Sequence, residues 1–233
     1  MAESSLFSSL VDRGAFLAHE KQIRLAEIVD GHDQWDADLE VPSLTFTFAD
    51  RTLVCQAQLL GSAAPGPDSW LWGWANDSVS GAGTEMARWL CDVGQRDRIP
   101  ELCTPEIPLG PAGMEAPEAF WYRLVFAVTA LVPDWDGYYA PDIGGGAIGP
   151  LLVRHPALAL PPPDLMRVVR VLSEGVSTVR VTDHRAAVAS YAALRGIACT
   201  GTADGCVLAL PEGTLELTFD HLNRLGGLRS STQ

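Results

Sequence analysis

Apolar residues recur at helical spacing in several parts of the chain. Between residues 4 and 29 they lie three or four positions apart and Gly31 follows, so the sequence predicts an amphipathic helix that ends there. The same spacing predicts helices over 84–94, with Thr84 as the N-cap, and over 117–132, with Pro117 in the first turn. The Pro-rich stretch 96–117 between them is expected to be irregular.

Alternation of apolar and polar residues predicts strands between these helices. Residues 44–50 and 52–63 alternate on either side of a tight turn, and 69–76 follow as a third strand. Short links between the three favour an antiparallel meander. Residues 32–40 are expected to form an acidic loop. The apolar runs in 135–141 and 147–154 predict two further short strands joined by glycines.

A Pro-rich linker, residues 155–164, precedes a different pattern. Asp164 is expected to cap a helix over 165–174, a second helix ends at Gly196, and 177–183 form a possible strand between them. Two or three short strands are expected to follow the second helix. The predicted fold class is therefore α+β: an antiparallel meander covered by helices, with a smaller C-terminal α/β unit. We expect two domains, 1–157 and 158–233, joined by this linker.

The net charge of −13 changes which partners are expected. Residues 158–233 contain seven acidic and seven basic residues, so the whole excess of negative charge lies in 1–157. Such a field repels phosphate backbones, so nucleic-acid binding is disfavoured, and it favours a basic protein or a metal ion. Solubility alone is the simpler explanation of the charge.

The cysteines and the apolar content indicate where the chain resides. Five scattered cysteines without a Cys-x-x-Cys pair argue against a disulfide framework or a structural zinc site, although Cys199 and Cys206 flank a possible hairpin. Cys55 is expected to be buried in a strand. We expect no signal peptide and no transmembrane helix, and hence a cytoplasmic protein without membrane contact.

The stretch 69–76 is rich in tryptophan and has two interpretations. In a strand, Trp70, Trp72 and Trp74 would share one face, because side chains alternate with a period of two. Packing in the core under a helix is the favoured interpretation, and an aromatic wall for a flat or cationic ligand is the alternative. Asn76 and Asp77, at the end of the strand, are candidate ligand-binding residues or simple turn formers.

A second cluster lies in residues 133–146. Asp134, Asp136, Tyr138 and Tyr139 are candidate ligand-binding residues there, or parts of a polar loop at a strand edge. The Asp-x-Asp-Gly sequence lacks the other ligands of a calcium loop. The acids of 32–40 are expected to form a solvated loop. Because the sequence has no metal-binding, phosphate-binding or nucleophile motif, no cofactor, no metal and no catalytic residue is predicted.

These motifs together resemble an uncharacterised bacterial family, a domain of unknown function. The resemblance rests on a Trp-x-Trp-x-Trp-Ala-Asn strand (70–76) and a later Gly-Tyr-Tyr segment (137–139) followed by Gly145-Gly146, and it covers about residues 35–153. Gly73 departs from the alanine expected there. The resemblance implies a bacterial, cytosolic setting and one domain that holds both motifs, and it implies no activity.

Three classes of function remain open from the sequence. The first is a non-catalytic binding or interaction protein, with an acidic face for a basic partner or a small-ligand pocket beside the Trp strand. The second is a small-molecule enzyme that uses Asp77, Asp134, Asp136 and Tyr139. The third is a structural protein whose tryptophan faces are buried between subunits. The sequence does not indicate an oligomeric state.

Overall fold

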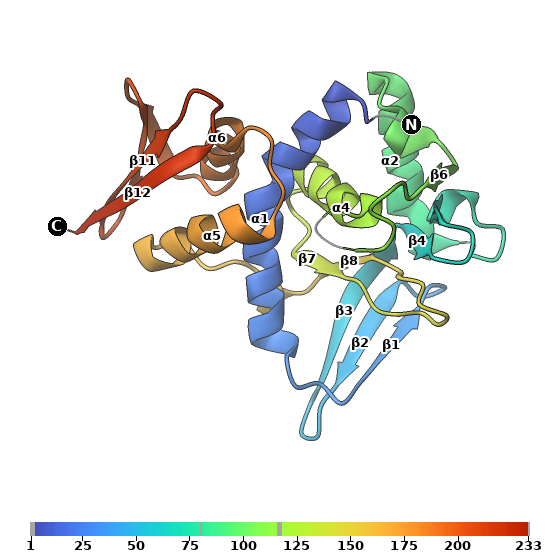
Figure 1. Cartoon of the computed structure of the whole chain (residues 1–233). Helices are drawn as coiled ribbons and strands as arrows, with labels where there is room; N and C mark the ends of the chain where they lie inside the picture. Colours follow the sequence, from blue (N-terminus) through green and yellow to red (C-terminus); the bar gives the residue numbers. More distant parts are fainter. Residues whose placement is uncertain (1–2, 80, 116–117, 233) are drawn as a thin grey trace. The chain divides into compact units, whose positions relative to one another are not determined.

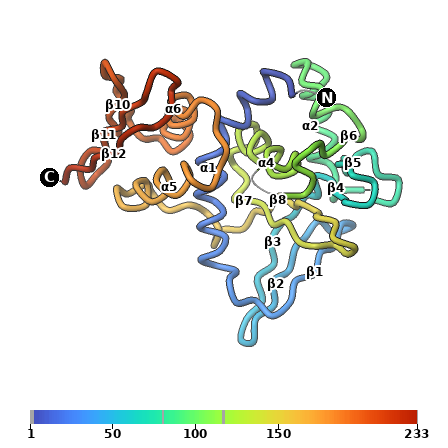
Figure 2. The backbone as a smooth tube through the Cα atoms, viewed as in Figure 1, coloured from blue at the N-terminus to red at the C-terminus, as the bar shows by residue number. Residues whose placement is uncertain are grey.

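The chain has an α+β fold (Figures 1 and 2). The computed structural model describes residues 3–79, 81–115 and 118–232, and these residues form six α-helices and three antiparallel sheets. They divide into two compact units. Unit 1 comprises the described residues of Met1–Phe7, Lys21–Val125 and Asp134–Leu160, and unit 2 those of Ser8–Glu20, Phe126–Pro133 and Pro161–Gln233. The first helix, α1 (Ser5–Val29), confirms the expected helix and supplies residues to both units.

The largest sheet belongs to unit 1. Its order is β1-β2-β3-β8-β7, with all neighbours antiparallel, and its strands are β1 (Gln34–Asp38), β2 (Ser43–Thr47), β3 (Thr52–Leu59), β7 (Gly137–Tyr139) and β8 (Leu151–Arg154). Leu25 and Val29 of α1 pack with Leu44, Phe46 and Cys55 of this sheet in one buried cluster. Cys55 is therefore the small buried apolar residue that was expected, and burial raises the pKa of its thiol to about 11.

The prediction of a loop over 32–40 is wrong, because strand β1 occupies most of this stretch. Trp35 pairs with Phe46 and Ala37 pairs with Leu44, so the apolar members of this stretch face the same cluster. The intervening Asp36 and Asp38 are exposed. The alternation was present in the sequence, but the number of acidic residues concealed it.

A second sheet in unit 1 has the order β4-β5-β6 (Figure 2). The strand expected over 52–63 is interrupted at Leu60, where the backbone N–H bonds to the Pro150 carbonyl, and β4 (Gly61–Ala64) continues in the new sheet. There β4 pairs with β5 (Ser69–Trp72), which pairs with β6 (Glu106–Pro108). The expected antiparallel meander is present, but its three strands are β1, β2 and β3. The hairpin of β2 and β3 is as predicted, whereas β5 belongs to a different sheet.

The strand expected over 69–76 is only half as long as predicted. It ends at Trp72, and Gly73–Ala75 form a 3-10 turn, so Trp74 does not share a strand face with Trp70 and Trp72. The Gly73 N–H bonds to the Leu60 carbonyl, and a Cβ at this position would lie 3.2 Å from the Leu59 carbonyl oxygen. Glycine fits at this turn because the backbone at the end of β3 lies too close to leave room for a side chain.

The remaining helices of unit 1 lie near their expected positions. Helix α2 (Glu85–Asp97) follows Thr84 and ends at Arg98, which has a left-handed backbone, and α4 (Phe120–Leu131) supplies its last residues to unit 2. Pro117 lies outside the described residues. The stretch 96–117 is less irregular than expected, since it contains α3 (Pro100–Cys103) and β6.

Unit 2 contains two helices and a four-stranded antiparallel sheet. Helix α5 contacts β11 and β12, and α6 contacts β9. The sheet has one strand more than expected, in the order β12-β11-β10-β9. The bounds are α5 (Leu165–Thr178), α6 (His184–Leu194), β9 (Ala198–Gly201), β10 (Gly205–Leu210), β11 (Gly213–Phe219) and β12 (Leu225–Thr232). Asp164 caps α5 as predicted, since its side chain accepts a hydrogen bond from the Arg167 N–H.

The strand expected over 177–183 is wrong. Helix α5 continues to Thr178, and the irregular segment after it is held by Asp12 of α1. Its carboxylate accepts hydrogen bonds from the N–H and hydroxyl of Thr182 and from the Asp183 N–H. These bonds satisfy the backbone donors that a strand would have paired with a neighbour.

A buried ion cluster lies beside these contacts in unit 2. Glu20 of α1 is fully buried, and its carboxylate lies 2.9 Å from Arg167 Nε and 2.8 Å from Arg195 Nε. The Tyr191 hydroxyl donates to the same carboxylate at 2.9 Å. Burial, with the Glu20 charge beside it, raises the pKa of Tyr191.

Among the described residues, none of the helices combines the length and the apolar character that crossing a bilayer requires.

Candidate functional site

Trp70 and Trp72 form an aromatic core in unit 1. Both side chains are fully buried, and their rings meet edge to face with centroids 5.6 Å apart. Trp70 also meets Phe120 of α4 at 6.4 Å, and the Trp72 indole N–H donates to the Glu101 carbonyl at 3.1 Å. These two indoles therefore anchor β5 to α3 and α4, as the core interpretation predicts, and do not form an exposed wall.

A groove lies at the margin of this core. Two adjoining pockets of about 640 and 230 Å³ share lining residues, and together we call them the acidic groove. Ile107, which pairs with Trp70 across β5 and β6, and Phe120 form part of its wall. The complete lining is Glu3, Asp68, Glu101, Ile107, Pro108, Leu109, Gly110, Pro111, Ala112, Gly113, Met114, Glu115, Glu118 and Phe120.

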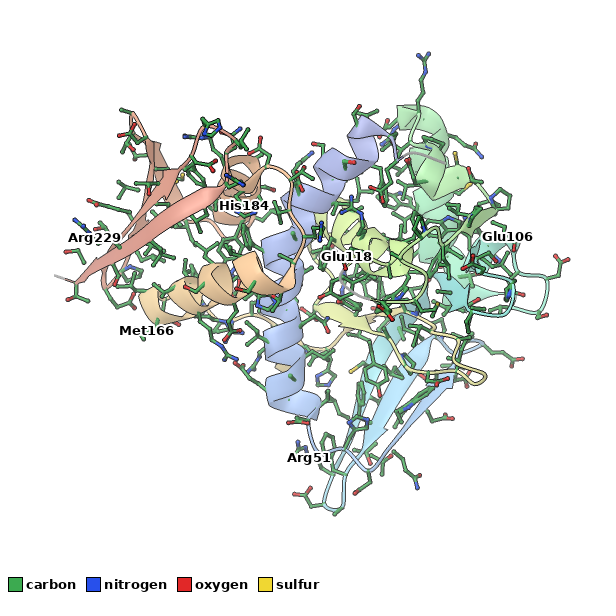
Figure 3. The ribbon with its side chains drawn as sticks, in the orientation of Figure 1. Arg51, Glu106, Glu118, Met166, His184 and Arg229 are labelled. Atoms are coloured by element: carbon green, nitrogen blue, oxygen red, sulfur yellow. The ribbon has the colours of Figure 1, made fainter. Side chains whose placement is uncertain are left out.

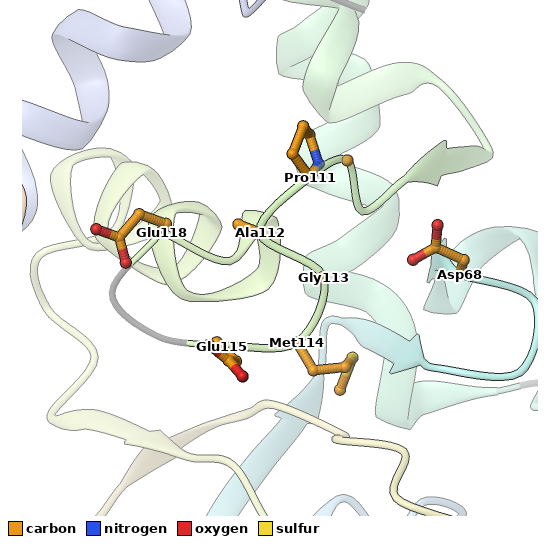
Figure 4. Close-up of a pocket in the computed structure, with 8 residues that line it drawn as sticks. Asp68, Pro111, Ala112, Gly113, Met114, Glu115 and Glu118 are labelled. Atoms are coloured by element: carbon orange, nitrogen blue, oxygen red, sulfur yellow. The ribbon is translucent and has the colours of Figure 1, made fainter.

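The groove is strongly negative. Its lining contains five carboxylates and, among the described residues that line it, no lysine or arginine. In the view of Figure 4, Asp68 and Glu118 lie on opposite sides of the Pro111–Met114 segment, and Figure 3 labels Glu118 within the whole chain. Apolar walls with carboxylates at the rim are suited to a cationic group that has an apolar stem.

Two of the carboxylates are fixed by neighbours. Both oxygens of Glu101 accept hydrogen bonds from Ser4, one from its N–H and one from its hydroxyl at 2.8 Å. Glu3 forms a two-pronged ion pair with Arg123, whose Nε donates at 2.8 Å. Asp68, Glu115 and Glu118 also line the groove, and all three are exposed.

The Gly-Tyr-Tyr segment forms β7 and does not line the acidic groove. Tyr138 is buried beside Tyr122, and burial raises its pKa well above the ordinary value. Tyr139 faces the other side of the strand and its hydroxyl lies 3.3 Å from His32 Nε2.

The two aspartates before β7 have structural partners. Asp134 forms an exposed ion pair with Arg154, and Asp136 accepts a hydrogen bond from the His155 N–H at 2.8 Å. No metal-ligating group of three or more His, Cys, Asp or Glu side chains occurs within the described ranges.

Asn76 and Asp77 form a turn after the 3-10 segment. The Asn76 side chain accepts a hydrogen bond from the Ser78 N–H at 3.0 Å, and the Asn76 carbonyl accepts one from the Val79 N–H. Asp77 is exposed. This geometry is that of an asparagine-led turn. The nine predicted residues therefore do not meet in one site: they divide among the buried core, this turn, the edge of β8 and the His32 contact.

The comparison with protein families matches residues 8–156 to a family of unknown function (DUF6882). The chain belongs to this family. No curated protein and no solved structure matches the chain. The DUF6882 match begins earlier than the expected limit of residue 35, so it includes most of α1, and it ends at residue 156, within three residues of the expected limit of 153.

The DUF6882 region contains nearly all of the acidic groove, of which only Glu3 lies outside the match. Sequence reasoning missed all five carboxylates of the groove, because they lie in separate segments that no periodic pattern relates: Glu3 near the start, Asp68 in a loop, Glu101 and Glu115 in the Pro-rich stretch and Glu118 just after it. The pairing of Trp70 with Ile107 brings that stretch next to the Trp strand. A run of acids around prolines was the only signal available.

Proposed function

We propose that this member of DUF6882 is a non-catalytic binding protein whose acidic groove receives a basic partner, in a bacterial cytoplasm. The observation that supports this most is the groove itself, with five carboxylates around an apolar wall and no described basic lining residue. An arginine- or lysine-rich segment of a protein fits this chemistry, since its charged heads meet carboxylates and its methylene stems meet apolar side chains. The charge disfavours nucleic acid as the partner.

The other functions have less support. The enzyme alternative requires Asp77, Asp134, Asp136 and Tyr139 to act together, but their polar contacts involve different partners. A structural role for tryptophan faces between subunits is disfavoured, because Trp70 and Trp72 are already buried within the chain.

The test uses a fluorescein-labelled octa-arginine peptide and fluorescence anisotropy. We expect binding at 50 mM NaCl that weakens at least tenfold at 300 mM NaCl, because exposed charges are screened over about 8 Å at physiological salt. Octa-glutamate is expected not to bind.

Two triple variants separate the groove from the net charge. Asp68→Asn/Glu115→Gln/Glu118→Gln removes three groove charges, and Asp36→Asn/Asp50→Asn/Asp92→Asn removes three exposed charges of unit 1 elsewhere. At up to about 1 kcal/mol for each exposed pair, the groove variant is expected to lose tenfold or more in affinity, and the matched control threefold or less. Equal losses in the two variants, or no binding at low salt, would refute the proposal.

A further inference from the structure

A second pocket in unit 1 lies between the last two turns of α1 and β7. It has a volume of about 240 Å³ and shares no residue with the acidic groove. Leu25, Ala26 and Val29 form its apolar side, and Tyr139 and His32 close it. Gln22 and Asp30 add polar groups. We call it the His32 pocket.

Hydrogen bonds fix the roles of the two polar rings. His32 Nδ1 lies 2.8 Å from the Val29 carbonyl, which can only accept, so Nδ1 carries the proton. In the neutral imidazole, Nε2 is then an acceptor, and the Tyr139 hydroxyl at 3.3 Å donates to it. Burial raises the pKa of Tyr139, so this hydroxyl keeps its proton. With its proton directed to His32, the Tyr139 oxygen has lone pairs available as acceptors for a ligand.

Neighbouring aromatic rings hold this pair in place. His32 meets Phe46 edge to face at 5.2 Å, and Tyr139 meets Phe46 at 5.0 Å and Trp35 at 5.9 Å. Because each ring is packed against the others, the pocket is formed before a ligand arrives, and little conformational entropy is lost on binding.

The charge around the pocket favours a cation. One oxygen of the Asp30 carboxylate accepts the Gly31 N–H at 3.1 Å. The last carbonyls of α1 add the partial negative charge of a helix C-terminus. Arg51, at the turn between β2 and β3 (Figure 3), lies near the end of α1: it stacks over Phe48 and donates to the Ile28 carbonyl at 3.2 Å. It is exposed and paired with Asp50, so it offsets the field only in part.

We propose that the His32 pocket binds a primary arylalkylamine, a single aromatic ring joined by a short chain to an ammonium group. The ring packs on Leu25 and Val29, and the ammonium donates hydrogen bonds to Asp30 and to the Tyr139 oxygen. The volume is smaller than the roughly 300 Å³ lower limit of drug-sized pockets, so it suits one ring and not two. This site is independent of the proposed groove function.

The test maps backbone amide shifts in ¹H–¹⁵N NMR spectra during a titration with phenethylamine. We expect a Kd of about 1 mM, as for a fragment of this size, and shifts that centre on residues 22–32 and 139. Two comparison ligands test separately the aromatic ring and the positive charge of phenethylamine. Phenylpropionate has the ring but a negative charge, and butylamine has the positive charge but no ring. Each is expected to bind at least tenfold more weakly than phenethylamine.

Two variants test the polar contacts. Tyr139→Phe removes one acceptor and is expected to weaken phenethylamine about three- to tenfold, the usual range for one hydrogen bond. Asp30→Asn is expected to weaken phenethylamine and to leave phenylpropionate unchanged or tighter. Asp92→Asn, an equal charge change at an exposed position of α2, is the matched control and should change neither.

Shifts centred on residues 107–118 would overturn this proposal, as would equal affinities for phenethylamine and phenylpropionate. The groove variant Asp68→Asn/Glu115→Gln/Glu118→Gln separates the two sites, because it should abolish the peptide binding and leave phenethylamine binding intact. If a pocket variant does not fold, the shift map of the unmodified protein still decides.

Discussion

The buried carboxylate of Glu20 is the most sensitive single position that we identify in unit 2. Glu20→Gln keeps the shape of the side chain and removes its charge. The two guanidinium groups of Arg167 and Arg195 would then both lose their ion pair with Glu20, and their side chains are only 13 % and 11 % exposed. Removing one partner from a buried ion pair costs about 3–5 kcal/mol, because the remaining charge stays desolvated.

Urea unfolding at pH 7 measures this loss. With a slope of about 2 kcal/mol per molar urea, the midpoint should fall by about 1.5–2.5 M. Far-ultraviolet circular dichroism is the appropriate signal, because all seven tryptophans lie in unit 1 and their fluorescence does not report on unit 2 directly. The matched control is Glu216→Gln, the same change at an exposed position of β11, which should leave the midpoint unchanged.

A second substitution checks the cause. In the Glu20→Gln background, Arg195→Met removes a guanidinium that has lost its partner, so it should restore stability or cost little. A midpoint within 0.5 M of the unmodified protein after Glu20→Gln, or equal losses in the two glutamine variants, would refute the reasoning.

Three further changes have defined outcomes. Gly14→Ala should lower the melting temperature, because the new Cβ would lie 1.9 Å from the Phe126 carbonyl oxygen. Such overpacking costs about 1–3 kcal/mol, which exceeds the gain in helix propensity from glycine to alanine. A higher melting temperature would contradict this reasoning. Hydrogen bonds from backbone N–H groups and an arginine lower the pKa of Asp220 to about 2, so its ionised form stabilises the fold above pH 4 and the effect is lost as pH falls through 2. Asp220→Asn should therefore lower the melting temperature at pH 7 and make no difference below pH 2. Burial, with Cys199 nearby, raises the pKa of Cys206 to about 12, so mass spectrometry should find iodoacetamide on the exposed Cys199 first at pH 8; the reverse order would contradict the assignment.

Local pattern predicted five of the six described α-helices and most of the sheet strands, since each has its own periodicity. The stripe of α1 and the cap at Asp164 are examples, and both are found where the sequence places them. The exceptions depend on partners distant in the sequence. Residues 177–183 were expected to form a strand from their β-branched residues, but the carboxylate of Asp12 holds them in an irregular path.

The candidate sites were less predictable than the fold. Tryptophan spacing located the aromatic core but not the groove at its margin, because that groove requires the pairing of Trp70 with Ile107 across 37 positions of sequence. The contact of His32 with Tyr139 likewise joins residues from the ends of unrelated elements. The division of the chain into two domains after residue 157 stays a prediction.

The inclusion of Ser8–Glu20 in unit 2 affects how the chain acquires its structure. Asp12 and Glu20 are synthesised before the threonine and arginines that they bind, which follow more than 140 positions later in the sequence. Both carboxylates must remain hydrated until these partners have been synthesised. A fragment that starts at residue 158 lacks both of these acids, so Arg167 and Arg195 lose their ion pairs with Glu20, and the fragment should need residues 5–29, added as a peptide, to become protease-resistant.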